Sequence, residues 1–177
     1  MDKEAIRRVV EDASPLVRNA DELHDTLLIQ RMLFLDENEE WKTFYDELEK
    51  TGRASKISVN GKTLFFALER WSIVRAIWPE AKPLPEFKLP SALDIPFTHE
   101  DAVKSVIRGK LEISGPITGK QLSKELSIKF ADIFQALLAL EVEGFILRGN
   151  YSKTVRNPHE ILADLEKEIP DEEIQWC

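Results

Sequence analysis

Five of the nine prolines in this 177-residue chain fall between Pro79 and Pro96, in the segment WPEAKPLPEFKLPSALDIPF. Each proline removes a backbone N–H donor and biases the residue before it towards extended conformations, so the segment cannot form a helix. Helical sequence patterns lie on both sides of it. We therefore predict two domains joined by an extended linker at residues 80–97. Because the linker contains apolar side chains such as Phe87 and Phe97, we expect it to pack against a domain surface.

The sequence after the linker, residues 98–156, predicts three helices followed by a β-hairpin. Thr98 and Asp101 form a shortened capping box before the first helix, and apolar residues then recur at helical spacing as far as Leu111. Gly144 lies where a glycine commonly ends a helix. The later elements are expected as helices at 120–126 and 130–143 and hairpin strands at 145–148 and 151–154.

Residues 1–79 repeat this order and add a final helix. The pair Asn60-Gly61 is a strong signal for a type I′ turn between two strands. Three helices followed by a hairpin is the winged-helix order, so the predicted fold is mainly α with small β-hairpins (α+β), as tandem winged-helix domains. Residues 157–177 are expected to form a C-terminal helix or connector. The elements expected in the first domain are helices at 2–13, 21–32, 40–51 and 69–77 and strands at 56–59 and 63–68.

The charge is distributed unevenly along the chain. With 24 Lys and Arg against 32 Asp and Glu, the net charge of −8 argues against a protein whose entire surface wraps nucleic acid. Residues 1–97 carry 14 basic and 18 acidic side chains, and residues 155–177 carry 2 and 7. Residues 98–154 carry 8 and 7. Only this segment lacks an acidic excess, so it is the segment in which a local basic face is best accommodated.

Several common classes of site are disfavoured by the sequence. The single cysteine, Cys177, excludes an intramolecular disulfide and a cysteine-rich metal site. His24, His99 and His159 lie in three different elements without a second ligand at metal-binding spacing, so we expect capping, packing or surface roles for them. No apolar run approaches the ~20 residues that span a bilayer. The charged N-terminus lacks the apolar core of a signal peptide, which predicts a cytoplasmic protein.

Several separate segments of the chain carry a resemblance to known proteins. They are VRNADELHDTLL at 17–28, ELEKTGRA at 47–54, ALERWSIVRAIWPEA at 67–81, VIRGKLEISGPITGKQLSKELSI at 106–128 and ALLALEVEGFILRG at 136–149. Together they resemble the C-terminal region of Lhr-type (large helicase-related) ATP-dependent bacterial DNA helicases. Residues 173–177 also resemble the Glu-Trp-Cys element at which that family begins an arginine-rich helix. The resemblance covers most of the chain and both predicted domains.

The resemblance implies a role in DNA repair beside an ATP-driven motor. In Lhr-type proteins the ATPase activity, with its ATP and Mg²⁺, resides in two RecA-like domains that precede this region. The present chain has no Gly-x-x-x-x-Gly-Lys-Ser/Thr phosphate loop and no Asp-Glu-x-His run. We therefore expect a non-catalytic piece of a longer helicase, without a cofactor of its own. Its partners would be single-stranded or forked DNA and other domains of the same chain.

Winged-helix geometry predicts nucleic-acid contacts from the third helix and the wing. Basic side chains neutralise phosphates there, and Tyr151 is placed to stack on an unpaired base. The outer face of the third helix is close to neutral, so the wing is favoured over the helix. The candidate nucleic-acid-binding residues of the second domain are Lys129, Gln135, Arg148, Asn150, Tyr151, Lys153 and Arg156.

The first domain is a weaker candidate for DNA binding. Arg53, Lys56 and Lys62 are positioned to form a basic wing. The acidic run DENEE at 36–40 suits a helix N-terminus but repels phosphate. This domain is therefore expected to act mainly as a spacer.

Three alternative functions remain open at the level of sequence. The first is a purely architectural module that mediates contacts within the helicase or between subunits. The second is part of a DNA glycosylase-like region, because the C-terminal regions of Lhr-type helicases resemble winged-helix DNA glycosylases; no catalytic carboxylate is nominated. The third is a winged-helix transcription regulator, which the lack of a basic recognition helix disfavours.

Overall fold

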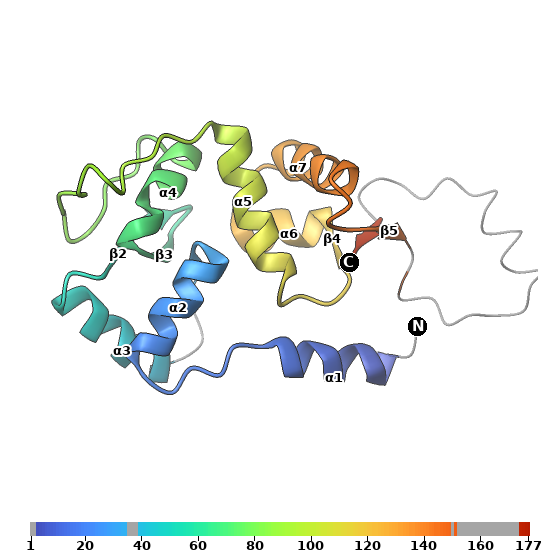
Figure 1. Cartoon of the computed structure of the whole chain (residues 1–177), viewed down its shortest axis with the longest axis horizontal. Helices are drawn as coiled ribbons and strands as arrows, with labels where there is room; N and C mark the ends of the chain where they lie inside the picture. Colours follow the sequence, from blue (N-terminus) through green and yellow to red (C-terminus); the bar gives the residue numbers. More distant parts are fainter. Residues whose placement is uncertain (1–2, 35–38, 150, 152–173) are drawn as a thin grey trace, which may run out of the picture. The chain divides into compact units, whose positions relative to one another are not determined.

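The computed structural model describes residues 3–34, 39–149, 151 and 174–177. The fold is mainly helical with two small three-stranded antiparallel sheets (Figure 1), which confirms the predicted α+β class at that level. Internal contacts divide the chain into two compact units. The larger unit comprises residues 15–110, and the other comprises residues 1–14 together with residues 111–177. We refer to them as the central unit and the terminal unit.

The central unit contains one sheet with the strand order β1-β3-β2. Strands β2 and β3 pair over six residues each, and Asn60 and Gly61 between them have φ of 52° and 78°. Positive φ at both positions is what a type I′ turn requires, so this turn is confirmed. The elements are α2 (Ala20–Gln30), β1 (Leu33–Phe34), α3 (Glu39–Lys50), β2 (Ala54–Val59), β3 (Lys62–Ala67), η1 (Leu68–Arg70), α4 (Trp71–Ile77) and α5 (His99–Leu111, which reaches the next unit at its last residue).

The core of the central unit forms between α2, α3 and the sheet. Leu23 and Leu27 are fully buried on α2, and their spacing of four residues places them on one face of the helix. Tyr45 of α3 is 1% exposed, and its ring centroid lies 4.0 Å from that of Phe65 on β3 in an edge-on arrangement. This packing holds the hairpin against the two helices.

The proline-rich segment packs along the edge of this sheet, as expected. Lys56 of β2 and Leu84 exchange two backbone hydrogen bonds, and the buried Ser55 hydroxyl donates to the Pro85 carbonyl at 3.0 Å. The Phe87 ring lies 5.8 Å from the Trp71 ring, which itself stacks near Phe66. The segment is therefore tied to β2 by its backbone and to the sheet face by its aromatic side chain.

The terminal unit contains the second sheet, with the strand order β4-β6-β5. We predicted hairpin strands at 145–148 and 151–154, but residues 152–154 lie outside the described residues. Among the described residues, Arg148 pairs with Trp176 and Gly149 with Gln175. The elements of this unit are α1 (Lys3–Ala13), β4 (Ile117–Thr118), α6 (Gly119–Leu126), α7 (Phe130–Val142), β5 (Arg148–Gly149) and β6 (Gln175–Trp176).

Trp176 forms the centre of the second sheet. Its side chain is fully buried, and its ring lies 6.4 Å from Phe134 of α7. Leu147 and Cys177 extend the pairing by exchanging two backbone hydrogen bonds. Residues from the C-terminal end of the chain therefore complete a sheet that begins at Ile117. The helix expected within residues 157–177 lies largely outside the described residues.

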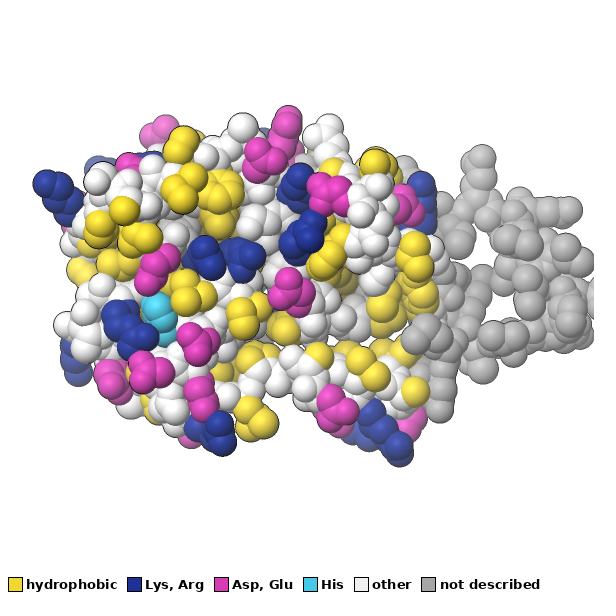
Figure 2. All heavy atoms as spheres, viewed as in Figure 1, with side chains coloured by type: hydrophobic (Ala, Val, Ile, Leu, Met, Phe, Trp, Pro, Cys, Tyr) yellow, Lys and Arg dark blue, Asp and Glu magenta, His cyan; other side chains and the backbone are white. Residues whose placement is uncertain are grey.

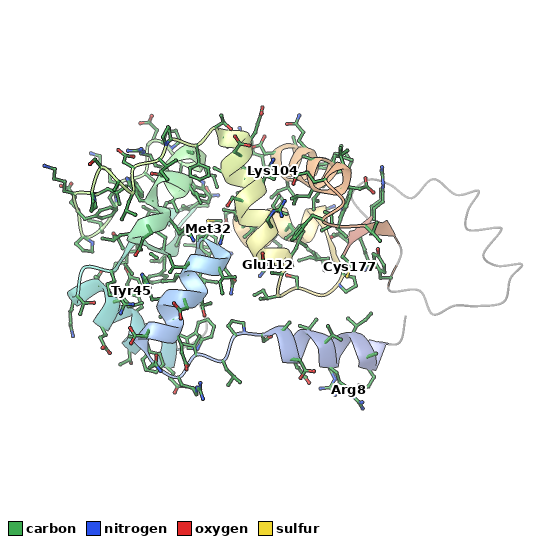
Figure 3. The ribbon with its side chains drawn as sticks, in the orientation of Figure 1. Arg8, Met32, Tyr45, Lys104, Glu112 and Cys177 are labelled. Atoms are coloured by element: carbon green, nitrogen blue, oxygen red, sulfur yellow. The ribbon has the colours of Figure 1, made fainter. Side chains whose placement is uncertain are left out.

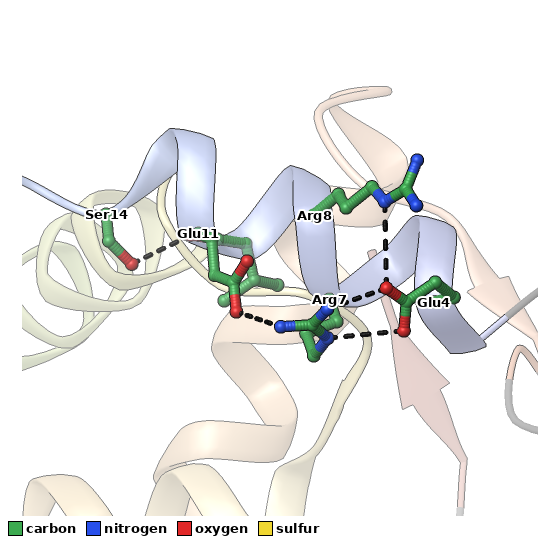
Figure 4. A network of polar contacts seen from close by, with 6 residues as sticks. Glu4, Arg7, Arg8, Glu11 and Ser14 are labelled. Carbon is green, nitrogen blue, oxygen red and sulfur yellow. Dashed lines mark hydrogen bonds and ion pairs between the residues drawn. The ribbon is translucent and has the colours of Figure 1, made fainter.

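Helix α1 combines an exposed ionic face with a close contact to the loop before β4. Arg7 bridges Glu4 and Glu11 at 2.6 Å each, one turn apart on either side (Figure 4). A Cβ at Gly115 would lie 2.8 Å from a methyl group of Val10, so this glycine permits the loop to approach the helix. In the part of the chain that is described, no helix is long and apolar enough to cross a membrane.

Candidate nucleic-acid interface

Helix α7 exposes two of the predicted contact residues without gathering them on one stripe. Lys129 is exposed at the N-cap of the helix, and Gln135 is exposed six residues later. Six residues correspond to about 120° around the axis, so the two side chains point in different directions. Glu141 and Glu143 follow at the end of the helix and oppose a phosphate-binding role for that end.

Arg148 of β5 is already engaged by neighbours in the terminal unit. Its Nε donates to Glu141 Oε1 at 2.8 Å, and its guanidinium carbon lies 5.8 Å from the Trp176 ring centroid. The Arg148 side chain remains half exposed. The ion pair offsets its charge locally, so binding a phosphate at Arg148 requires competition with Glu141.

Tyr151 is held against the same small sheet. Its hydroxyl donates to the Leu147 carbonyl at 3.1 Å, and its backbone N–H donates to Gln175 Oε1 at 2.9 Å. Its ring approaches Gly149 so closely that a Cβ there would lie 3.3 Å from it. Burial raises the pKa of the Tyr151 phenol, and the negative charges of Cys177 and Glu141 add to the effect.

These contacts bring two of the seven predicted residues, Arg148 and Tyr151, together beside β6. Lys129 and Gln135 belong to the helix instead. The other three, Asn150, Lys153 and Arg156, lie outside the described residues.

In the central unit, the three predicted wing residues each contact another side chain. Arg53 forms an ion pair with Asp21, and Lys56 lies 3.0 Å from Glu49 and over the Tyr45 ring. Lys62 is exposed, with its ammonium group 5.8 Å from the Phe34 ring centroid. The two ion pairs reduce the charge that this hairpin offers to phosphate.

The histidines do not form a metal site among the described residues. His24 is buried on α2 with its Nε2 3.4 Å from Glu69 Oε2, and neither atom has a hydrogen-bond partner there. His99 Nδ1 lies 3.2 Å from the Ala76 carbonyl oxygen, and His159 is not described. No group of three or more potential ligands occurs in the described part of the chain.

The structure also brings together two arginines that the sequence analysis did not single out, Arg31 and Arg70. Both donate to the Leu28 carbonyl at the end of α2. In Figure 2, Lys and Arg side chains lie over this end of α2 and along α5, interspersed with Asp and Glu side chains. Figure 3 labels two neighbouring landmarks, Met32 just after α2 and Lys104 on α5. No local pattern could have revealed the pair, because 38 residues separate its members in the sequence.

Comparison with known proteins does not assign this chain to a family. A scan against models of known protein families finds no match to it, and a search of curated proteins finds no significantly similar sequence.

Proposed function

We propose that the chain is a non-catalytic, tandem winged-helix segment of an Lhr-like ATP-dependent DNA helicase. It contributes to binding and orienting single-stranded or forked DNA during repair, while motor domains elsewhere in the protein supply translocation. ATP and Mg²⁺ would belong to those motor domains, and the resemblance of several segments to that family motivates the assignment.

The observation that carries the proposal is the strand order shared by the two sheets. In each sheet the third strand along the chain lies between the first and the second, and all pairs are antiparallel. A winged helix has this arrangement, in which a short early strand joins the two wing strands and helices precede the wing. The order β4, α6, α7, β5, β6 follows this plan, and β1, α3, β2, β3 follows a shortened version of it.

Fluorescence anisotropy with fluorescein-labelled DNA tests the binding function directly. Single-stranded and forked oligonucleotides are titrated with the 177-residue chain at 50 and 200 mM salt. Because the proposed contacts are mainly to phosphates, affinity should fall between the two salt concentrations, with a slope that reports the number of contacts. Absence of binding to either DNA at the lower salt concentration would contradict the DNA-binding role.

A second candidate function is a purely architectural module, and the surface around β5 favours it. Val142 is 89% exposed and Leu147 is 68% exposed, and Phe145 between them is also exposed. These exposed apolar side chains are close together in the sequence, and exposed apolar groups of this size favour a protein–protein contact. Since Arg148 is already paired with Glu141, this region is better suited to docking on protein than to gripping phosphate.

Substitution of wing residues in the full-length helicase separates the two candidates. If the wing grips DNA, replacing Arg148 and Lys153 with Ala together should weaken DNA binding and flatten its salt dependence. If the module is architectural, affinity for DNA should remain unchanged. In that case, Val142→Asp should instead disturb assembly of the helicase, measured by size-exclusion chromatography with light scattering.

A further inference from the structure

The end of helix α2 is occupied by two arginine side chains from different parts of the central unit. Arg31 follows the helix, and its terminal nitrogen Nη1 donates to the Leu28 carbonyl at 2.5 Å and to the Ile29 carbonyl. Arg70, from the end of η1, donates from Nε to the same Leu28 carbonyl at 3.0 Å. The shared acceptor fixes the two guanidinium groups next to each other.

The helix end neutralises only part of this positive charge. The C-terminus of a helix carries roughly half a negative charge, whereas the two guanidinium groups carry two positive charges. Within the described residues, neither arginine forms an ion pair with a carboxylate. Burial and the neighbouring charge of Arg31 lower the pKa of Arg70, and Glu69 offsets this only in part. Two like charges thus lie side by side without full compensation.

Both arginines keep N–H groups available for a further partner. An arginine has five N–H donors. The hydrogen bonds of Arg70 among the described residues use Nε alone, which leaves its two terminal nitrogens. Arg31 uses Nε and Nη1, which leaves Nη2. Both side chains are half-buried, so their remaining donors are positioned by the fold while still accessible from solvent.

Helix α5 adds a hydroxyl group and further positive charge. Arg31 Nε donates to Ser105 Oγ at 3.1 Å, and the described residues offer no acceptor for the hydroxyl proton of Ser105. Lys104 and Arg108 flank Ser105 along the helix, although Lys104 also lies 3.8 Å from Asp101. Basic side chains on this part of α5 add to the local positive potential.

The close approach of α5 to α2 depends on Gly109. A Cβ at this position would overlap the Ile29 carbonyl oxygen and lie 3.1 Å from the Cα of Gln30. Because glycine has no Cβ, α5 can lie directly against the end of α2, and the contact holds Ser105 beside Arg31. The cluster is therefore fixed by backbone packing as well as by its hydrogen bonds.

Arg31 also occupies a backbone position that favours glycine. Its φ is 73°, in the left-handed region that costs most residues about 1 kcal/mol or more. A glycine would end α2 without that cost. An arginine there instead places a guanidinium group over the helix end. Replacement of Arg31 by glycine therefore removes the charge with little disturbance of the backbone.

From this geometry we propose that Arg31, Arg70 and Ser105 form a phosphate-binding site for the backbone of a nucleic-acid strand. This inference rests on the proposed DNA-binding function and adds a contact point in the central unit, apart from the predicted wings. Paired guanidinium groups and a hydroxyl are the donors that suit phosphate oxygens. The site reads no base and contributes affinity and salt dependence.

Two variants and one matched control test the site. Arg31→Gly and Arg70→Gln each remove one guanidinium. Arg75→Gln removes the same charge from the same unit, at an exposed arginine paired with Asp94 at 2.7 Å. Each protein is titrated onto fluorescein-labelled single-stranded DNA at several salt concentrations, after circular dichroism has confirmed that it is folded. The second arm follows the arginine Nε–Hε signals by NMR while inorganic phosphate replaces chloride at constant ionic strength.

The proposal predicts that Arg31→Gly and Arg70→Gln each weaken DNA binding about tenfold at low salt, as expected for loss of one charge-assisted contact. Each should also reduce the salt slope by about 0.7, the value for one phosphate of a single strand. Arg75→Gln should bind as the wild type does. The wild-type Arg31 and Arg70 signals should shift with phosphate.

The outcomes separate this site from the broader proposal. If the wild type binds DNA and both variants bind equally well, the arginine site is overturned while the DNA-binding function stands. If the wild type fails to bind DNA but phosphate shifts the Arg31 and Arg70 signals, the site is retained for free phosphate and the DNA-binding function is overturned. If neither DNA nor phosphate has an effect, both are overturned.

Discussion

The two sheets have the same strand order, but the last two strands of each are joined by connections of very different length. In the central unit, β2 and β3 are joined by the two residues Asn60 and Gly61 and pair over six residues each. In the terminal unit, β5 and β6 are separated by residues 150–174 and pair over two residues each. Closing the longer connection costs about 2 kcal/mol more in chain entropy. The first sheet is thus stabilised locally, whereas the second depends on what its last strand buries.

Burial of Trp176 offsets the chain-entropy cost of the long connection between β5 and β6. Its indole is fully buried, and it contacts the ring of Phe134 and the guanidinium of Arg148. Tryptophan has a very large apolar surface, so burying this one residue offsets much of the entropy cost of the longer connection. The comparison therefore predicts that the terminal unit is sensitive to one side chain and the central unit to one turn.

The largest effect is expected for Trp176→Ala. Loss of a fully buried aromatic side chain should destabilise the terminal unit by about 3–5 kcal/mol and release β6 from β4 and β5. Urea unfolding followed by circular dichroism measures the loss, and amide hydrogen exchange at Ile117 and Arg148 reports release of the strand. Leu147→Ala, a change at an exposed residue next to β5, is the control and should cost less than about 0.5 kcal/mol. Equal effects of the two substitutions would refute the anchoring role of Trp176.

A smaller effect is expected for Gly61→Ala in the turn of the first sheet. Its φ of 78° is unfavourable for alanine, so the hairpin should lose about 1–2 kcal/mol. Asn60→Gly is the control at the neighbouring position. Glycine adopts the same positive φ without strain, so this change should leave the stability nearly unchanged. Thermal unfolding of each variant compares them. If Gly61→Ala destabilised the protein as much as Trp176→Ala, the contrast between the two sheets would be lost.

The stability of the central unit should fall at high pH, because this unit contains the buried phenol of Tyr45. Burial raises the pKa of Tyr45, and the negative charge of Glu49 adds to this. Because the folded-state pKa lies above the unfolded value of about 10, the stabilisation is fully present below pH 10. It is lost as the pH rises further, by about 1.4 kcal/mol for each unit. Urea unfolding of the wild type at pH 9 and 11 measures this loss.

Tyr45→Phe is the control for this titration. It keeps the ring that packs on Phe65 and removes the phenol, so its stability should change less between pH 9 and 11. Parallel loss of stability in wild type and variant would show that other groups, such as the lysines, are responsible.

The smallest effect on stability is expected for the ion pair between Arg148 and Glu141. Both side chains lie at the surface, at 50% and 20% exposure, so Glu141→Gln should cost less than about 1 kcal/mol. The same change frees the Arg148 charge and should strengthen DNA binding if the wing contacts phosphate. Thermal unfolding and fluorescence anisotropy give the two readouts. Unchanged affinity would favour the architectural role of this surface.

The sequence predicted the helices well because their signals are local. Thr98 accepts from the Asp101 N–H at 3.1 Å, as the capping pattern indicated. Gly144 has a φ of 72° at the end of α7, as expected for a terminal glycine. Leu137 and Leu140 are buried on the predicted face of α7. Strand β1 was not predicted, because two residues are too few to display alternation.

The candidate sites were harder to predict because they depend on side chains that are distant in sequence. Charge type suggested Arg148 as a phosphate contact, but only the structure shows its engagement by Glu141 and Trp176. The arginine pair at the end of α2 joins residues 31 and 70, and no short motif includes both. Gly109 on α5 gave no signal beyond a glycine inside a helix.

The sequence by itself determined the mainly helical class, most helix boundaries and the Asn60-Gly61 turn. These features depend on hydrogen bonds and side-chain spacing within a few residues along the chain. Only the tertiary structure decided that Trp176 would complete the second sheet and that Arg31 would meet Arg70. Such pairings join residues that are far apart in the sequence. They therefore depend on the free energy of packing in the folded molecule and not on local preferences along the chain.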